Sequence, residues 1–131
     1  MKNNSFKYCI LKYVHSPFLE ESLNVGIFFQ FPNGEFRFKC PDNFDRVKGA
    51  YNEFNDGQLR EWMEAIKLKV AIINTSANRS DLSFEDIVRK DATVLQWGGV
   101  KISVLYSQDY KTIVDDYYSL YFAEHFNVKQ I

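Results

Sequence analysis

The sequence predicts a small α+β domain, an antiparallel sheet of about five strands with helices packed mainly on one face. One observation behind this class is a pair of apolar, strand-like runs on either side of Pro32-Asn33-Gly34. Another is an apolar stripe with helical spacing between Leu59 and Ile73. The last is the order of the elements, because strands come first and no regular β-α-β alternation follows. At 131 residues, the chain is expected to form one domain, residues 1–131.

Residues 6–14 are rich in aromatic and β-branched side chains and predict the first strand. Apolar groups fall on both faces of this segment, which indicates a central strand. Residues 15–22 include Pro17, which has no amide hydrogen to donate to a neighbouring strand. They therefore predict a loop that leads to the second strand.

Asn33 and Gly34 predict a two-residue type I′ turn between the second and third strands, because both central positions of that turn need a positive φ. The apolar alternation of the flanking runs agrees with the resulting register. This register pairs Phe31 with Phe36, Phe29 with Phe38, and Ile27 with Cys40. The other face of the third strand is then polar and expected to face solvent; it carries Glu35, Arg37 and Lys39.

Helical signals follow the third strand. Residues 44–51 predict a short helix, and Asn55 with Gln58 resembles a capping box for a longer helix that ends near Asn74. The stripe of the longer helix is Leu59, Trp62, Met63, Ile66, Val70 and Ile73. Ser83, with Asp86 three positions later, predicts the cap of another short helix that extends to residue 90.

The last third of the chain predicts two strands and a helix. Residues 94–97 and 100–106 are strand-like, and Gly98-Gly99 between them predicts a second hairpin. Ser107 or Asp109 is expected to cap the final helix. The apolar side chains of that helix are Ile113, Val114, Tyr117, Leu120 and Tyr121.

Composition narrows the classes of function. The 16 Lys and Arg residues are matched by 17 Asp and Glu residues, and a net charge of −1 disfavours a general nucleic-acid binder. Aromatic residues make up 17% of the chain and predict a ring-rich core, with a stacking platform for bases as the alternative. Cys9 and Cys40 are expected to be buried, reduced thiols of a cytoplasmic protein. No apolar run is long enough to predict a membrane span or a signal segment.

One polar cluster adjoins the apolar second strand: Glu20, Glu21, Asn24 and Gly26. It predicts a recognition site in which a carboxylate and an amide lie near a glycine, and the glycine lets a ligand or another backbone come close to the strand. In the alternative, the acids are solvated and Gly26 makes room for a ring of the neighbouring strand. Phe18 is an apolar residue inside the same polar loop and is a candidate anchor for a partner, or a cap of the core.

The sequence contains no complete catalytic pattern. His15 and His125 are far apart, and no serine or cysteine lies in a nucleophile-elbow motif. Asp109-Tyr110-Lys111 has the residue types of a nuclease site but lacks a strand-borne acidic partner. No metal-ligand spacing or glycine-rich phosphate loop is present, so no catalytic residue, metal or cofactor is predicted.

The opening of the chain resembles a bacterial family named domain of unknown function 3037. The resemblance rests on Tyr8-Cys9-Ile10-Leu11-Lys12-Tyr13-Val14, on Glu20-Glu21, and on Leu23-Asn24-Val25-Gly26-Ile27-Phe28-Phe29, within residues 6–31. The similar pattern in that family is "Y-x-I-L-R-Y-V", then a short loop that contains Pro and Glu, and then "N-V-G-V". The resemblance implies a small partner encoded beside HipA-like kinases, in a toxin-antitoxin or phage-defence setting.

These observations favour a non-enzymatic module that binds or regulates a protein partner, with a kinase-like partner implied by the resemblance. The alternative is a small enzyme or ligand-binding protein that acts on nucleic acid or nucleotide through Glu20 and Asn24. The predicted partner- or ligand-binding residues are Phe18, Glu20, Glu21, Asn24 and Gly26.

Overall fold

The computed structural model describes residues 4–16, 21–44, 56–88 and 95–122. These residues form a five-stranded antiparallel sheet in the order β3-β2-β1-β4, with β5 also paired to β1. The strands are β1 (Ser5–Ser16), β2 (Glu21–Gln30), β3 (Phe36–Lys39), β4 (Leu95–Trp97) and β5 (Lys101–Val104). The helices are α2 (Asp56–Asn74) and α3 (Tyr110–Tyr121), with short 3₁₀ helices η2 (Arg79–Asp81) and η3 (Phe84–Asp86).

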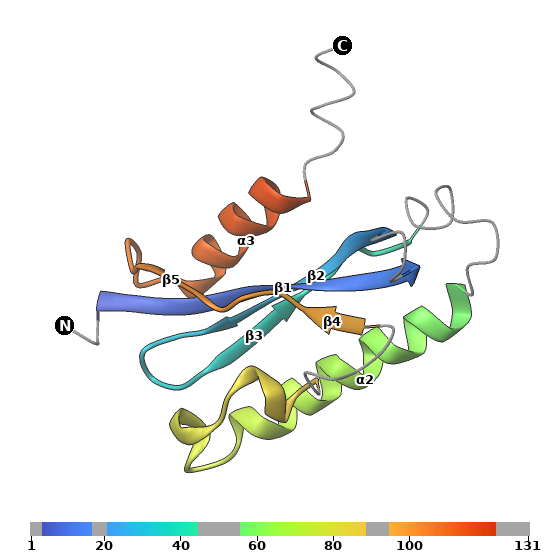
Figure 1. Cartoon of the computed structure of the whole chain (residues 1–131). Coiled ribbons are helices and arrows are strands. Elements are labelled where there is room, and N and C mark those ends of the chain that lie inside the picture. The colour runs from blue at the N-terminus through green and yellow to red at the C-terminus, as the bar shows by residue number, and fades with distance from the viewer. Residues whose placement is uncertain (1–3, 17–20, 45–55, 89–94, 123–131) are drawn as a thin grey trace.

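The α+β class is confirmed, but the helices are divided between the two faces of the sheet. In Figure 1, α2 lies below the sheet and α3 above it. The expectation of helices mainly on one face is corrected because β1 and β2 carry apolar side chains on both faces, and each face needs a cover. The α2 face buries Cys9, Leu11, Val25, Phe28, Phe36, Leu59, Met63, Ile66 and Val70. The α3 face buries Phe6, Tyr8, Ile10, Ile27, Phe29, Phe31, Ile113 and Val114.

Strand β1 is central, as the sequence predicts. It pairs with β2 on one side and with β4 and β5 on the other. Its register with β2 shifts between Leu11 and Lys12, where β2 contributes the extra residue Val25. Leu11 and Val25 are both fully buried on the α2 face, so this bulge adds an apolar side chain to the core instead of exposing one.

The turn between β2 and β3 contains Pro32, Asn33 and Gly34, not the predicted two residues. Phe31 N–H donates to the C=O of Glu35 at 2.9 Å, and the φ of Gly34 is 86°. The predicted register is therefore wrong by one residue. The observed pairs are Ile27 with Lys39, Phe28 with Phe38, Phe29 with Arg37, and Gln30 with Phe36. Proline fixes a φ that suits the first turn position, and a glycine with positive φ then completes a three-residue hairpin.

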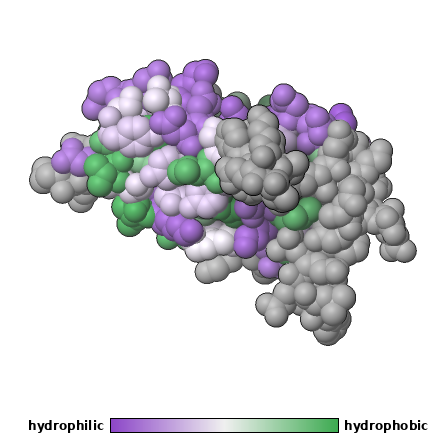
Figure 2. Space-filling model, turned by 90° about the horizontal axis from the view of Figure 1, so that it is seen from above, coloured by the Kyte–Doolittle hydropathy of each residue, from purple (hydrophilic) through white to green (hydrophobic). Residues whose placement is uncertain are grey.

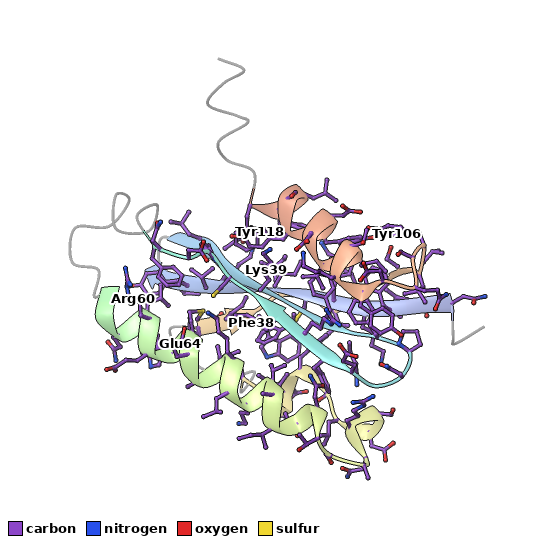
Figure 3. The ribbon with its side chains drawn as sticks, turned by 180° about the vertical axis from the view of Figure 1, so that it is seen from behind. Phe38, Lys39, Arg60, Glu64, Tyr106 and Tyr118 are labelled. Atoms are coloured by element: carbon purple, nitrogen blue, oxygen red, sulfur yellow. The ribbon has the colours of Figure 1, made fainter. Side chains whose placement is uncertain are left out.

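The one-residue slip turns Arg37 and Lys39 toward α3, because neighbouring strand residues point to opposite faces. Lys39 Nζ donates to Asp115 Oδ1 at 3.0 Å and lies 4.9 Å from the centre of the Tyr118 ring, beside which Figure 3 shows it. Arg37 lies 5.9 Å from the centre of the Tyr110 ring. The expectation that these two cations face solvent holds only in part, because α3 packs against this side of β3 and leaves the Arg37 and Lys39 side chains 38% and 40% exposed.

Strands β4 and β5 run in the same direction along one side of β1, so the predicted hairpin at Gly98-Gly99 is wrong. Gly98 N–H donates to the C=O of Ile10 at 2.9 Å and continues the pairing of β4. The next pair is Lys101 with Tyr8. Two residues, Gly99 and Val100, separate Gly98 from Lys101, whereas only Cys9 separates Ile10 from Tyr8 on β1. The glycines therefore form a bulge that interrupts one strand and does not reverse the chain.

Both long helices agree with their predicted stripes, except at one position. Helix α2 ends at Asn74 as expected, and Asn55 of its predicted cap lies outside the described residues. Helix α3 has Asp109 as its N-cap, whose side chain accepts a hydrogen bond from Lys111 N–H. Leu120 was expected on the apolar side of α3 but is 74% exposed, whereas the next residue, Tyr121, contacts Tyr8 of β1.

The short helical segments are confirmed in part. Ser83 and Asp86 form a capping box at η3, in which the Asp86 carboxylate accepts from Ser83 N–H at 2.7 Å. The predicted extension of this helix to residue 90 is wrong at Ile87 and Val88, which are described but not helical, and residues 89–90 lie outside the described residues. The predicted helix at 44–51 also lies outside them, apart from Phe44, which is buried.

Candidate interaction surface

The predicted site residues belong to the β1–β2 loop and to the start of β2. Phe18 and Glu20 lie outside the described residues. Glu21 is the first residue of β2, and Asn24 is half-buried opposite Lys12 of β1. The structure therefore places Glu21, Asn24 and Gly26 along one strand.

Gly26 is closely packed against the neighbouring strand. A Cβ atom on Gly26 would lie 2.5 Å from Cε1 and Cζ of the Phe38 ring. That ring packs against Phe28 of the core, with 4.7 Å between the ring centres and a tilt of 38° between the ring planes. The space beside Gly26 is thus filled by a phenylalanine, which agrees with the alternative reading in which this glycine makes room for a ring.

The two edges of the sheet offer backbone groups to any incoming strand, and the β3 edge is blocked at Phe36. Phe36 N–H donates to Asn74 Oδ1 at 2.7 Å, and Asn74 Nδ2 donates to the C=O of Phe36 at 2.8 Å. The primary amide at the end of α2 therefore takes both positions that a neighbouring strand would occupy at Phe36. Covering an edge in this way protects a sheet from pairing with other chains.

The β5 edge differs, as its ladder with β1 shows. Leu105 N–H donates to the C=O of Asn4 at 2.7 Å. In an antiparallel pair, hydrogen-bonded and non-hydrogen-bonded pairs alternate, so Ser103 bonds to β1 whereas Ile102 and Val104 direct N–H and C=O away from it. No described residue meets these outward-facing groups.

The side chains of the same two residues are also exposed. Ile102 and Val104 are each 69% exposed, and neither belongs to the core cluster under α2. Ser103 points to the opposite face, where its hydroxyl lies 2.6 Å from Tyr117 Oη on α3. Figure 2 shows hydrophobic groups reaching the surface toward the left end of the molecule, where Figure 1 places β5.

Analysis of the sequence missed this surface. The alternation of apolar and polar residues from Val100 to Val104 normally places the apolar side chains inside, and here it places them outside. The only signal was that the segment is short, β-branched and separated from β4 by glycines, features that fit an edge strand.

A cavity of about 380 Å³ adjoins β5 on the α2 face of the sheet. Gln30, Lys7 and Ile102 line it and are neighbours across β2, β1 and β5, because Lys7 pairs with both of the others. Pro32 of the turn and Ser80 of η2 line it as well. The exposed edge and this cavity therefore share Ile102.

A second cavity, of about 240 Å³, lies between β3 and the start of α2. Its charged residues balance one another, since Arg60 and Lys67 occur with Asp42 and Glu64. Lys67 Nζ donates to Glu64 Oε2 at 3.1 Å. Burial raises the pKa of the Cys40 thiol, although nearby Lys67 opposes the shift. A cavity with this balance does not favour an anionic nucleotide.

Three hydroxyl and thiol groups of the described chain are held in their neutral forms. Burial raises the pKa of Cys9 to about 12. Burial and the hydrogen bond to Asp116 raise the pKa of Tyr106 to about 12, and burial followed by the contact with Tyr121 raises the pKa of Tyr8. Raised pKa values make these groups poor nucleophiles at neutral pH, which suits structural roles.

Two further results bear on function. Among the described residues, no three His, Cys, Asp or Glu side chains gather where they could hold a metal ion. The helices in that part of the chain are also too short or too polar to cross a membrane. Comparison with known proteins found no matching family model, no similar curated protein and no similar solved structure.

Proposed function

We propose that this protein is a non-enzymatic interaction module that binds an extended segment of a protein partner by adding it as a strand at the edge of β5. The observation that carries the proposal is the conjunction at Ile102 and Val104 of outward-facing backbone groups and 69% exposed apolar side chains. Strand addition uses both features, since the backbone gives affinity and alternate side chains give specificity.

The difference between the two edges supports this assignment. Proteins block edges that are not used, and here Asn74 blocks β3 at Phe36 with two hydrogen bonds. At β5, Lys101 is the one charged residue of the strand, and its ammonium lies 5.6 Å from the centre of the Tyr121 ring on the α3 face. The apolar residues of β5 therefore point to the face that lacks this charge, and they fit a partner strand with apolar side chains on that face.

The family resemblance suggests the partner's class. A HipA-like kinase would supply the strand, and the toxin-antitoxin or phage-defence setting would follow from that partner. The nucleic-acid alternative draws less support, because most rings of the described chain pack in the two core clusters instead of forming an exposed stacking surface.

A library of random peptides, displayed on phage and selected on the immobilised full chain, tests the proposal. We expect the selected peptides to alternate apolar and polar residues. Binding should be lost with Ile102→Lys combined with Val104→Lys, which place two charges on the edge. Leu120→Lys is the matched control, because Leu120 is 74% exposed and belongs to the last turn of α3, not to β5.

The proposal fails if the selected peptides bind the double variant as tightly as the wild type. It also fails if Leu120→Lys abolishes binding and the β5 variant does not, since the apolar surface in use would then be on α3. Selection by the same protocol on the Asn74→Ala variant should add peptides that bind at the β3 edge.

A further inference from the structure

We infer that the strand added at β5 carries a carboxylate on the α3 face of the sheet, at the position opposite Lys101. The inference rests on the proposed function and names a second element of the partner's chemistry, besides the apolar side chains that meet Ile102 and Val104. It is carried by the place of Lys101 in the β5 ladder and by an ammonium that no carboxylate of the described residues neutralises.

Lys101 is a direct neighbour of the added strand. It pairs with Tyr8 of β1, and because the ladder alternates, its N–H and C=O point to β1, as those of Ser103 do. On its outward side, Lys101 therefore meets the added strand in a non-hydrogen-bonded pair. The Cα atoms of such a pair are about 4.5 Å apart, and both side chains leave the sheet on the same face. A partner side chain thus reaches Lys101 without crossing another strand.

The ammonium of Lys101 is exposed and weakly held. It lies 5.6 Å from the centre of the Tyr121 ring, near the outer limit of a cation–π contact. No carboxylate of the described residues forms an ion pair with it. Ser103 is on the same face, but its hydroxyl lies 2.6 Å from Tyr117 Oη and has its partner on α3. Of these two side chains of β5, Lys101 is therefore the one left to recognise a partner.

A carboxylate complements Lys101 better than a neutral side chain does. An ammonium has three donors and no acceptor, so a carboxylate supplies both the acceptor and the opposite charge. Opposite charges directly across two antiparallel strands stabilise the pair, and like charges destabilise it. The flexible four-carbon stem of lysine lets the ammonium turn from the Tyr121 ring to a carboxylate at the edge.

The place of the acid in the partner's sequence follows from the direction of the added strand. Every described ladder of this sheet is antiparallel, and we assign the same direction to the added strand. Successive partner residues then meet Val104, Ser103, Ile102 and Lys101, in that order. The expected pattern is an apolar residue, a residue of any type, a second apolar residue and an acid.

The test uses the full chain and the peptides selected from the random library on wild type. We expect glutamate or aspartate to be enriched directly after the second apolar residue. In titrations at low ionic strength, a synthetic peptide with glutamate there should bind about threefold more tightly than the same peptide with glutamine. Lys101→Glu should reverse the order, so that the same peptide with lysine binds most tightly. Added salt should weaken both preferences.

Lys12→Glu is the matched control for the charge reversal. Lys12 is also exposed, but it pairs with Asn24 and Gln96 on the two sides of β1, so it is not at an edge. This variant has the same net charge as Lys101→Glu and should keep the preference for glutamate. The glutamine peptide should bind wild type and Lys101→Glu equally, which verifies that the variant folds and keeps its edge.

The outcomes separate the two proposals. If peptides depend on Ile102 and Val104 but show no preference for glutamate over glutamine, or keep it with Lys101→Glu, the acidic position is wrong and strand addition stands. An acid enriched directly before the first apolar residue would overturn the antiparallel direction. A preference of wild type for lysine would overturn the assignment of a carboxylate. If no selected peptide depends on Ile102 and Val104, strand addition fails and the acidic position fails with it.

Discussion

The β3 edge and the β5 edge differ in what meets their outward-facing backbone. At β3, the side chain of Asn74 pairs with both backbone groups of Phe36, and the strand is held from its other face by the contacts of Lys39 with α3. At β5, no described residue meets the backbone of Ile102 and Val104, and their side chains are exposed. Both strands have four residues, two of them apolar, so the difference lies in what the helices reach and not in the composition of the edge.

The largest effect on the closed edge is expected at its turn. Gly34 has a φ of 86°, and a Cβ there would lie 3.0 Å from the backbone nitrogen of Ser80 in η2. Gly34→Val should therefore lower the free energy of unfolding by about 3 kcal/mol, from backbone strain and overlap together. Urea denaturation measures the loss. Gly99→Val is the control, because nothing lies within 4 Å of its Cβ position, and an equal loss in both variants would contradict this reading of the turn.

Removing the amide that closes β3 should have the next largest effect. Asn74→Ala leaves the N–H and C=O of Phe36 without their partners, and we expect a loss of about 2 kcal/mol in the free energy of unfolding. Sedimentation velocity should also show self-association, because the β3 edge becomes available for pairing. Thr75→Ala removes one hydrogen bond at the same helix end and is the control. A monomer with unchanged stability would mean that Asn74 does not close the edge.

The ion pairs that hold β3 against α3 should contribute less. Hydrogen bonds from Lys111 and Lys39 lower the pKa of Asp115 in the folded chain. Its contribution is therefore present above the unfolded pKa of about 4 and is lost as the pH falls through the lower folded pKa. Because Asp115 is 40% exposed, we expect Asp115→Asn to cost only about 0.5 kcal/mol at pH 7 and nothing in strong acid. Urea denaturation across this pH range measures the cost, with Asp81→Asn as the control variant. A loss in the free energy of unfolding that did not change with pH would contradict the role assigned to Asp115.

The open edge should show the smallest effect on stability. Ile102→Lys combined with Val104→Lys replaces exposed side chains, so the free energy of unfolding should change by no more than about 0.5 kcal/mol. Thermal and urea denaturation give this value for the variant that the binding experiment uses. A loss of several kcal/mol would show that these residues belong to the core and would remove the basis for a docking edge.

The sequence predicts the elements that depend on local patterns. The stripes of α2 and α3, the Asp109 cap and the central position of β1 all follow from spacing and residue type. The register of β3 does not, because Asn33-Gly34 matches two turn types and Pro32 decides between them. Gly98-Gly99 is ambiguous for the same reason, since glycine permits a bulge as readily as a reversal.

The candidate surface depends on long-range geometry and could not be predicted from spacing. Exposure of Ile102 arises because the core cluster under α2 does not extend to β5, which no local pattern records. The predicted loop site was a reasonable place to look, but Gly26 is packed against Phe38 and two of its companions, Phe18 and Glu20, lie outside the described residues.

Amide hydrogen exchange tests the difference between the edges most directly, residue by residue. In the free chain, the amides of Ile102 and Val104 should exchange fast, whereas the Phe36 amide should be protected by Asn74. Saturation with a β5-selected peptide should slow exchange at Ile102 and Val104 and leave Phe36 unchanged. Strand addition at β5 would be contradicted if Ile102 and Val104 were already protected in the free chain, or if both stayed fast with the peptide bound.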